Sequence, residues 1–317
     1  MSKQELTVNA GQTVARPRSG FMHEMKKNWM IYLMFVPIAA YYLIFCYKPM
    51  YGAMIAFQNY SPAKGFLGSE WVGFKHFTDF FGNYYFWRIL KNTLVISASS
   101  IIFAFPMPII LALLMNEIRS NAFKRTVQTI SYIPHFISMV VICGMIKTFT
   151  SDIGIITDLV VALGGDRVSL LTKPDAFVPI YIISDIWQGV GWGSIIYLSA
   201  LTNINQELYE AATIDGANRW QQTLHVTLPG IAPTIIIMLI LRLGSVLSVG
   251  YEKIILLYNE ITRETADVIS SFVYRKGLQE MSWSYSSAVG LFNSVVNFGF
   301  IIGTNAISRR VSDTSLW

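Results

Sequence analysis

The chain has 317 residues, of which 53% are hydrophobic and only 14% are charged. Soluble globular proteins carry about 25% charged residues, so this composition argues against a soluble domain and favours a membrane protein. The formal net charge of +5 does not point to nucleic acid, because basic residues beside membrane spans account for much of it.

A transmembrane helix needs about 20 consecutive, mostly apolar residues. Four segments of that length lack Asp, Glu, Lys and Arg, and two more contain one charge each, Asp185 and Arg242. The helices of a soluble core are usually shorter and carry a polar stripe. The sequence therefore predicts an all-α, polytopic membrane protein with six transmembrane helices. The predicted spans are about 29–47, 92–116, 126–146, 176–204, 226–251 and 281–308.

The segments that flank the spans predict the orientation of the chain. Residues 1–28 are basic and lack the apolar stretch of a cleavable signal peptide, so we expect a cytoplasmic N-terminus. Basic residues also border the expected inner span ends, in 117–125 and in 309–317. We expect a cytoplasmic tail (1–28), a single transmembrane domain (29–308) and a second cytoplasmic tail (309–317), in contact with the lipid of the cytoplasmic membrane.

Neither the cysteines nor the histidines indicate a metal site. Cys46 and Cys143 both fall inside predicted spans, where a lone cysteine behaves as a small hydrophobic residue. The four histidines are scattered, without the spacing of metal ligands. We predict no metal site and no disulfide.

A polar, helix-forming loop, residues 205–229, separates the fourth and fifth predicted spans. Asn205 can cap a helix whose first turn contains Glu207, where the helix dipole favours an acidic side chain. Gly216 is the natural end of this helix, because glycine readily adopts the left-handed conformation of a C-cap. If the helix continued further, Asp215 and Arg219 would be favourably paired.

A second short helix is expected from about 218 to 224, before Leu228 and Pro229 lead into the fifth span. These patterns alone predict a helical hairpin on the surface. Such a hairpin could also be a purely structural helix at the membrane interface.

The loop resembles the EAA loop of permease subunits of binding-protein-dependent ABC importers. Glu210-Ala211-Ala212 is followed after three residues by Gly216, and after nine more by Val226-Thr227-Leu228-Pro229. The family pattern has Ile where this chain has Val226. In the family, the loop docks in a groove of the cytoplasmic ATPase. The resemblance therefore implies a set of ATPase-coupling residues: Glu210, Ala211, Ala212, Asp215, Gly216, Leu228 and Pro229.

Further stretches resemble the carbohydrate-importer branch of the family, in particular LplB-like permeases. They include 47–60, 106–138 and 185–201. The resemblance implies the type I importer permease fold, alternating access, and oligosaccharides or polysaccharide fragments as cargo, some of them uronate-containing.

The resemblance also implies the partners: a cytoplasmic ABC ATPase dimer that binds ATP and Mg, a second homologous permease subunit, and an extracytoplasmic solute-binding lipoprotein or periplasmic protein. No G-x-x-x-x-G-K-[ST] motif occurs in the chain, so ATP must be hydrolysed by another subunit. We expect a non-catalytic transport subunit with no cofactor of its own and no nucleic-acid partner.

Charged side chains inside spans are costly and usually face a partner or a water-filled cavity. Asp185 and Arg242 lie at similar expected depths, so they could form an ion pair or line the translocation pathway. Aromatic faces and amides typically hold sugars. Candidate lining residues, each of which could equally be a packing residue, are therefore Trp187, Gln188, Trp192, Asn293 and Asn297. With an anionic cargo, Arg242 and Lys147 would gain interest.

Two other functions remain open from the sequence. An ion-coupled secondary transporter could use Asp185 as its proton or sodium site, although such a protein would not need the polar loop. A membrane-embedded enzyme is a weaker alternative, because no paired carboxylates or nucleophile–base pair stand out.

Overall fold

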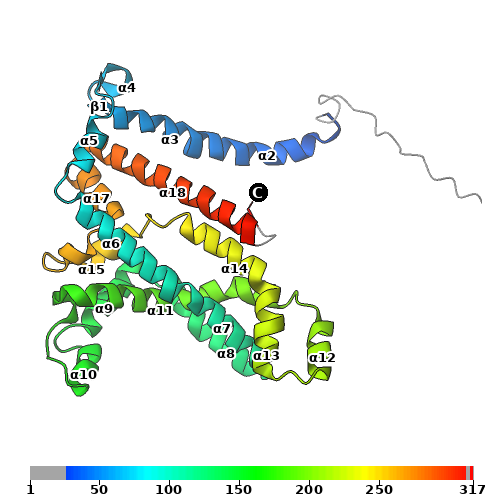
Figure 1. Cartoon of the computed structure of the whole chain (residues 1–317). Coiled ribbons are helices and arrows are strands. Elements are labelled where there is room, and N and C mark those ends of the chain that lie inside the picture. Colours follow the sequence, from blue (N-terminus) through cyan, green and yellow to red (C-terminus); the bar gives the residue numbers. More distant parts are fainter. Residues whose placement is uncertain (1–25, 312–314, 317) are drawn as a thin grey trace, which may run out of the picture. The chain divides into compact units, whose positions relative to one another are not determined.

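Helices make up almost all of the regular structure in a computed structural model that describes residues 26–311 and 315–316 (Figure 1). The chain divides into two compact units, Met1–Ala53 and Met54–Trp317. In the smaller unit, α2 (Trp29–Tyr41) continues through η1 (Tyr42–Tyr47) and α3 (Lys48–Met50). This helix is apolar all round, as a bilayer-spanning helix should be, and Pro37 does not interrupt it. The next element, η2 (Tyr51–Phe57), contains the boundary between the units.

The larger unit begins with a small cap of short elements, followed by the long helices. The cap contains β1 (Gln58–Asn59), α4 (Gly65–Gly68), β2 (Glu70–Trp71) and α5 (Lys75–Phe81). The two strands pair antiparallel, with Gln58 opposite Trp71 and Asn59 opposite Glu70.

The remaining helices follow in chain order. The first group is α6 (Phe86–Ser99), η3 (Ser100–Ala104), α7 (Pro106–Glu117), α8 (Asn121–Tyr132), η4 (Ile133–Phe136), α9 (Met139–Phe149), α10 (Ile155–Ala162), η5 (Leu170–Thr172) and α11 (Pro174–Leu201). The second group is α12 (Gln206–Ile214), α13 (Arg219–Gln222), η6 (Thr223–Thr227), α14 (Leu228–Leu243), α15 (Tyr251–Leu257), α16 (Arg263–Ala266), α17 (Ile269–Tyr274), η7 (Arg275–Gln279) and α18 (Trp283–Val311).

Within the described residues, four helices are long and apolar enough to cross a membrane: Trp29–Phe57, Phe86–Glu117, Arg219–Leu243 and Trp283–Arg310. Each overlaps one predicted span. A fifth candidate is the pair Asn121–Phe136 and Met139–Phe149, bent by 100° at its break. The chain is therefore a mostly helical, polytopic membrane protein with four to five candidate spans.

The stretch 126–146, which we expected as one span, contains that bend. Pro134 lies in η4 and cannot donate a main-chain hydrogen bond, which favours the end of α8. Ser138 then caps α9, because its hydroxyl accepts a hydrogen bond from the N–H of Val141 at 3.4 Å. The apolar composition was visible in the sequence, but the change of direction was not.

The predicted span 226–251 also differs from the structure, because α14 ends at Leu243. Residues 244–250 are not helical, and side chains of other helices bind their backbone. Ser97 of α6 donates to the carbonyl of Val246. Asn297 of α18 accepts from the N–H of Leu247 at 3.0 Å. Non-helical backbone at membrane depth requires such partners, or a water-filled cavity beside it.

Helix α11 packs against helices that precede it and helices that follow it in the chain. It is 28 residues long and contributes to two buried apolar clusters, one with α9 and α15 and one with α7 and α14. Gly191 lets it approach α8 closely, because a Cβ there would lie 2.1 Å from the carbonyl oxygen of Ser131. A Cβ on Gly193 would lie 3.0 Å from the ring of Pro108. Gly191 and Gly193 of the fourth predicted span thus serve close helix packing, whereas a Cβ on Gly189 would meet no atom within 4 Å.

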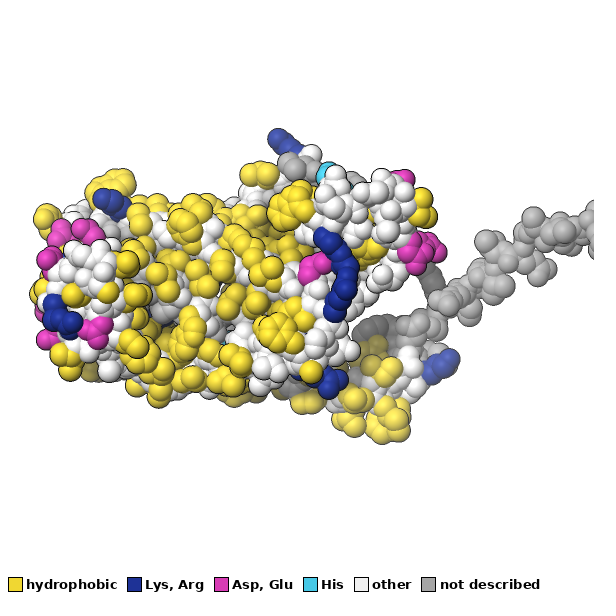
Figure 2. Space-filling model, turned by 90° about the horizontal axis from the view of Figure 1, so that it is seen from below, with side chains coloured by type: hydrophobic (Ala, Val, Ile, Leu, Met, Phe, Trp, Pro, Cys, Tyr) yellow, Lys and Arg dark blue, Asp and Glu magenta, His cyan; other side chains and the backbone are white. Residues whose placement is uncertain are grey.

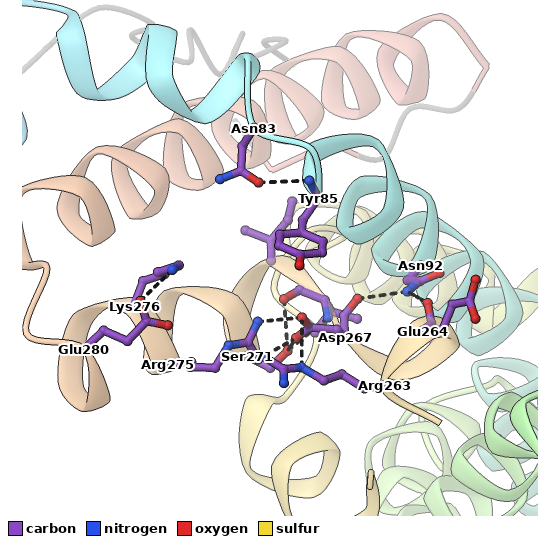
Figure 3. Close-up of polar contacts among 12 residues, drawn as sticks. Asn83, Tyr85, Asn92, Arg263, Glu264, Asp267, Ser271, Arg275, Lys276 and Glu280 are labelled. Carbon is purple, nitrogen blue, oxygen red and sulfur yellow. Dashed lines mark hydrogen bonds and ion pairs between the residues drawn. The ribbon is translucent and has the colours of Figure 1, made fainter. Parts of the chain in front are cut away.

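Polar side chains form a buried network beside α16 and α17 (Figure 3). Asp267 is 1% exposed and accepts hydrogen bonds from Arg275, at 2.6 Å, and from Ser271, at 2.7 Å. The amide of Asn92 on α6 donates to the main-chain carbonyl of Asp267 at 3.0 Å. Burial opposes the charge of Arg275, but hydrogen bonds and charge interactions with Asp267 and Tyr258 together raise the pKa of Arg275.

Hydrophobic side chains cover the middle of the face shown in Figure 2, and charged side chains gather toward its two ends. In Figure 1, α12 and α13 lie at one end of the larger unit and α10 lies at the other. An apolar belt between two polar ends is the arrangement that a bilayer requires.

Candidate coupling loop and translocation cavity

The predicted loop helix is α12, and both of its ends have the expected chemistry. Asn205 caps the N-terminus, because its side-chain oxygen accepts from the N–H of Glu207 at 3.1 Å. Gly216, with φ of 77°, ends the helix in a left-handed conformation. The N–H of Gly216 bonds to the carbonyl of Thr213 at 3.1 Å, and that of Ala217 bonds to Ala212 at 2.9 Å. Together these two bonds form a Schellman motif.

The second loop helix begins as predicted but does not stop before the span. Asn218 and Gln221 form a capping box at the start of α13. The helix then continues without a break from Arg219 to Leu243. It passes through the π-helical turn η6, and Leu228 and Pro229 follow as the first residues of α14. The second half of the loop 205–229 is thus part of the same continuous helix as α14.

Three side-chain contacts fix the loop. Arg219 pairs with Glu117 at the end of α7, with 3.0 Å between Nη1 and Oε2. The expected pair with Asp215 does not form, because α12 ends at Ile214. The hydroxyls of Tyr209 and Thr227 lie 3.0 Å apart, and Gln222 donates to Thr213 at 3.1 Å.

The outer face of the loop is exposed and partly apolar. Glu210, Ala211, Asp215 and Gly216 are exposed, whereas Ala212 and Leu228 are half-buried. Pro229 is exposed at the start of α14. Two large apolar side chains also project: Ile214 is 86% exposed and Trp220 is 69% exposed. These two side chains would be available for contact with another protein.

A second site is a cavity of about 270 Å³ inside the larger unit. Both charged residues predicted inside spans line it, but they do not pair with each other. Oδ1 of Asp185 lies 3.5 Å from Nζ of Lys253, at the start of α15. Nη2 of Arg242, at the end of α14, donates to the hydroxyl of Ser100 at 2.5 Å.

Lys253 was missed in the sequence because it lies beyond the fifth predicted span, in a segment expected outside the membrane. Lys253 is 2% exposed. Its Nζ donates to the main-chain carbonyl of Tyr181 at 3.3 Å and lies 4.8 Å from the centre of the Tyr181 ring. The only signal in the sequence was a single lysine followed by four apolar residues.

The other predicted lining residues do not line this cavity. Asn293 and Asn297 both donate to the hydroxyl of Ser248, at 3.4 and 2.8 Å. These hydrogen bonds connect α18 to the non-helical segment 244–250. Trp192 stacks on His135, with 4.6 Å between ring centres.

Trp187 lines a separate apolar pocket beside α9 and α10, and Gln188 is half-buried on α11. Lys147 is exposed at the end of α9 and also lies outside the cavity lining. Within the part of the chain that the structure describes, no group of His, Cys, Asp or Glu side chains is arranged to hold a metal ion.

Comparison with known proteins places these features in a family. Residues 104–313 match the family described as binding-protein-dependent transport system inner membrane component. Protein LplB of Bacillus subtilis (strain 168) is 45% identical over 298 residues, covering 94% of both chains. The polygalacturonan/rhamnogalacturonan transport system permease protein YteP of the same strain is 43% identical over 288 residues, covering 90% of both chains.

Two crystal structures are also similar. A bacterial ABC transporter involved in the import of the acidic polysaccharide alginate has a chain with 46% identity and a TM-score of 0.84, covering 92% of this chain and 98% of that one. A bacterial alginate ABC transporter in complex with an alginate pentasaccharide-bound periplasmic protein gives 45% identity and a TM-score of 0.86, covering 93% and 99%.

The resemblance inferred from the Glu210–Pro229 motif is confirmed. The chain belongs to the family of binding-protein-dependent transport system inner membrane components, and is a non-catalytic, multi-pass permease subunit of an ABC importer.

Proposed function

We propose that this permease carries oligosaccharides or polysaccharide fragments, including uronate-containing ones, across the cytoplasmic membrane by alternating access. The cargo class is supported by the names of the relatives, which transport polygalacturonan, rhamnogalacturonan or alginate. The cavity with Arg242, Asp185 and Lys253 supplies polar groups inside the bundle where such a cargo could bind.

The proposed assembly contains a cytoplasmic ABC ATPase dimer, which binds ATP and Mg, a second homologous permease and an extracytoplasmic solute-binding lipoprotein or periplasmic protein. The periplasmic protein in one similar structure supports the last of these. Six spans with both termini in the cytoplasm suit this assembly. In this arrangement α11, whose 28 residues extend for about 42 Å, is the sixth span, added to the five candidates described above.

The observation that carries the proposal is the coupling loop, a capped helix joined rigidly to α14 with exposed apolar side chains. An ion-coupled transporter would need neither this loop nor an ATPase. It would also need a carboxylate free to bind an ion, whereas Asp185 lies 3.5 Å from the ammonium group of Lys253.

Ile214→Asp tests this function. A charge at a position that is 86% exposed should leave the fold intact but disfavour an apolar contact with the ATPase. We expect the ATPase to be lost when the tagged permease is purified from membranes. Ile153→Asp is the matched control, because Ile153 is 84% exposed at the other end of the larger unit and should retain the ATPase. Equal retention of the ATPase by both variants would contradict the proposed role of the loop.

A further inference from the structure

The cavity contains one cation that no carboxylate neutralises. Among the residues that the structure describes, Arg242 takes part in no ion pair, and its side-chain contact is the neutral hydroxyl of Ser100. Ser100 is 2% exposed in η3 and so holds the guanidinium group in a fixed position. The charge of Arg242 therefore remains available to a molecule that enters the cavity.

Asp185, one of the two acidic residues of the cavity lining, already has a partner of opposite charge. The side chain of Lys253 is 3% exposed, against 37% for Asp185, so the ammonium group approaches the carboxylate from the protein side. The hydrogen bond to Tyr181 and the contact with its ring keep Lys253 in this position. Without Lys253, Asp185 would face the cavity as a free negative charge and would repel an anion.

Glu252 is the other acidic residue of the lining, and it is exposed. It forms no ion pair with Arg242. Serine hydroxyls from α6 and the non-helical segment complete the polar lining: Ser97, Ser245 and Ser248. A cavity that combines one fixed guanidinium group with several hydroxyls is suited to a molecule that carries both a carboxylate and hydroxyl groups.

We propose that Arg242 binds the carboxylate of an acidic saccharide unit, and that Lys253 keeps this site selective for anions by neutralising Asp185. This inference rests on the proposed function, since it assigns a cargo group to the same pathway. Guanidinium and carboxylate groups form strong, geometrically specific pairs. The volume of about 270 Å³ is close to the lower end of ligand pockets and suits one sugar unit of a longer chain.

The test is direct binding of two probes to the complete importer complex in nanodiscs. One probe is a galacturonate trisaccharide, and the other is the same trisaccharide after reduction of its carboxyl groups to neutral alcohols. Wild type should prefer the acidic probe by about tenfold or more, as expected for a hydrogen-bonded charge pair. Arg242→Gln should abolish that preference, and it should fold because Arg242 is exposed.

Charge rescue separates electrostatics from packing. Lys253→Gln should lose the preference, because Asp185 then offsets Arg242. Asp185→Asn combined with Lys253→Gln should regain it, because Arg242 is again the uncompensated cation. Lys75→Gln removes an exposed cation on α5, outside the cavity lining, and should leave the preference unchanged.

Each other outcome is decisive. An unchanged preference in Arg242→Gln, or a double variant as defective as Lys253→Gln alone, would overturn the inference. So would a wild type that binds the neutral probe as well as the acidic one, although saccharide import would then still stand. If wild type bound neither probe and took up no saccharide, the proposed function itself would fail.

Discussion

Asp267→Asn is expected to lower the free energy of unfolding by about 3–5 kcal/mol, the usual cost of removing one partner of a buried ion pair. Asp267 is 1% exposed, and the side chain of its partner Arg275 is only 13% exposed. The neutral amide would leave the guanidinium charge of Arg275 buried without compensation. Despite burial, which opposes the charge, interactions with Asp267 and Tyr258 raise the pKa of Arg275, so the charged form is favoured in the folded state. Thermal unfolding of the purified protein in nanodiscs would measure the loss.

Asp158→Asn is the matched control for this experiment. Asp158 pairs with Arg167 at 2.8 Å, but the side chains are 55% and 53% exposed. An exposed pair contributes about 0–1 kcal/mol, so the unfolding temperature should hardly change. Equal shifts in both variants would show that the Asp267 network does not stabilise the fold as described.

Gly216→Val is expected to uncouple the permease from its ATPase. Residue 216 has a φ of 77°, which costs an L-residue roughly 1–2 kcal/mol and a β-branched residue more. Relief of this strain would break the Schellman motif that orients α12 against α13. We expect the ATPase activity stimulated by the loaded binding protein to fall about tenfold or more, since 1.4 kcal/mol already corresponds to a factor of ten.

Gly216→Asn separates backbone strain from loss of the glycine itself. Asparagine tolerates the left-handed conformation and occurs at the same helix-end position. The asparagine variant should therefore keep most of the stimulated activity. If the valine and asparagine variants behaved alike, the left-handed turn would not be the feature that matters for coupling.

The coupling loop could be predicted from the sequence because its structure depends on neighbouring residues. Asn205 contacts the backbone two residues later, and Gly216 and Asn218 also act within a few positions. The motif that identified the family, Glu210-Ala211-Ala212 with Gly216 and Val226–Pro229, lies in the same loop.

The cavity could not be predicted in the same way, because its contacts join distant parts of the chain. The hydrogen bond from Arg242 to Ser100 crosses 142 positions, and that from Lys253 to Tyr181 crosses 72. Hydropathy located the single charges in the fourth and fifth spans, but not their partners. It also could not reveal the end of α14 at Leu243, where Ser97 and Asn297 replace the helical hydrogen bonds.

Uptake of the galacturonate trisaccharide into proteoliposomes that contain the complete complex tests the central claim most directly. With binding protein outside and ATP inside, we predict uptake that requires ATP hydrolysis and persists when proton and sodium gradients are collapsed. Uptake by the permease alone, driven by an ion gradient and independent of any ATPase, would contradict the account.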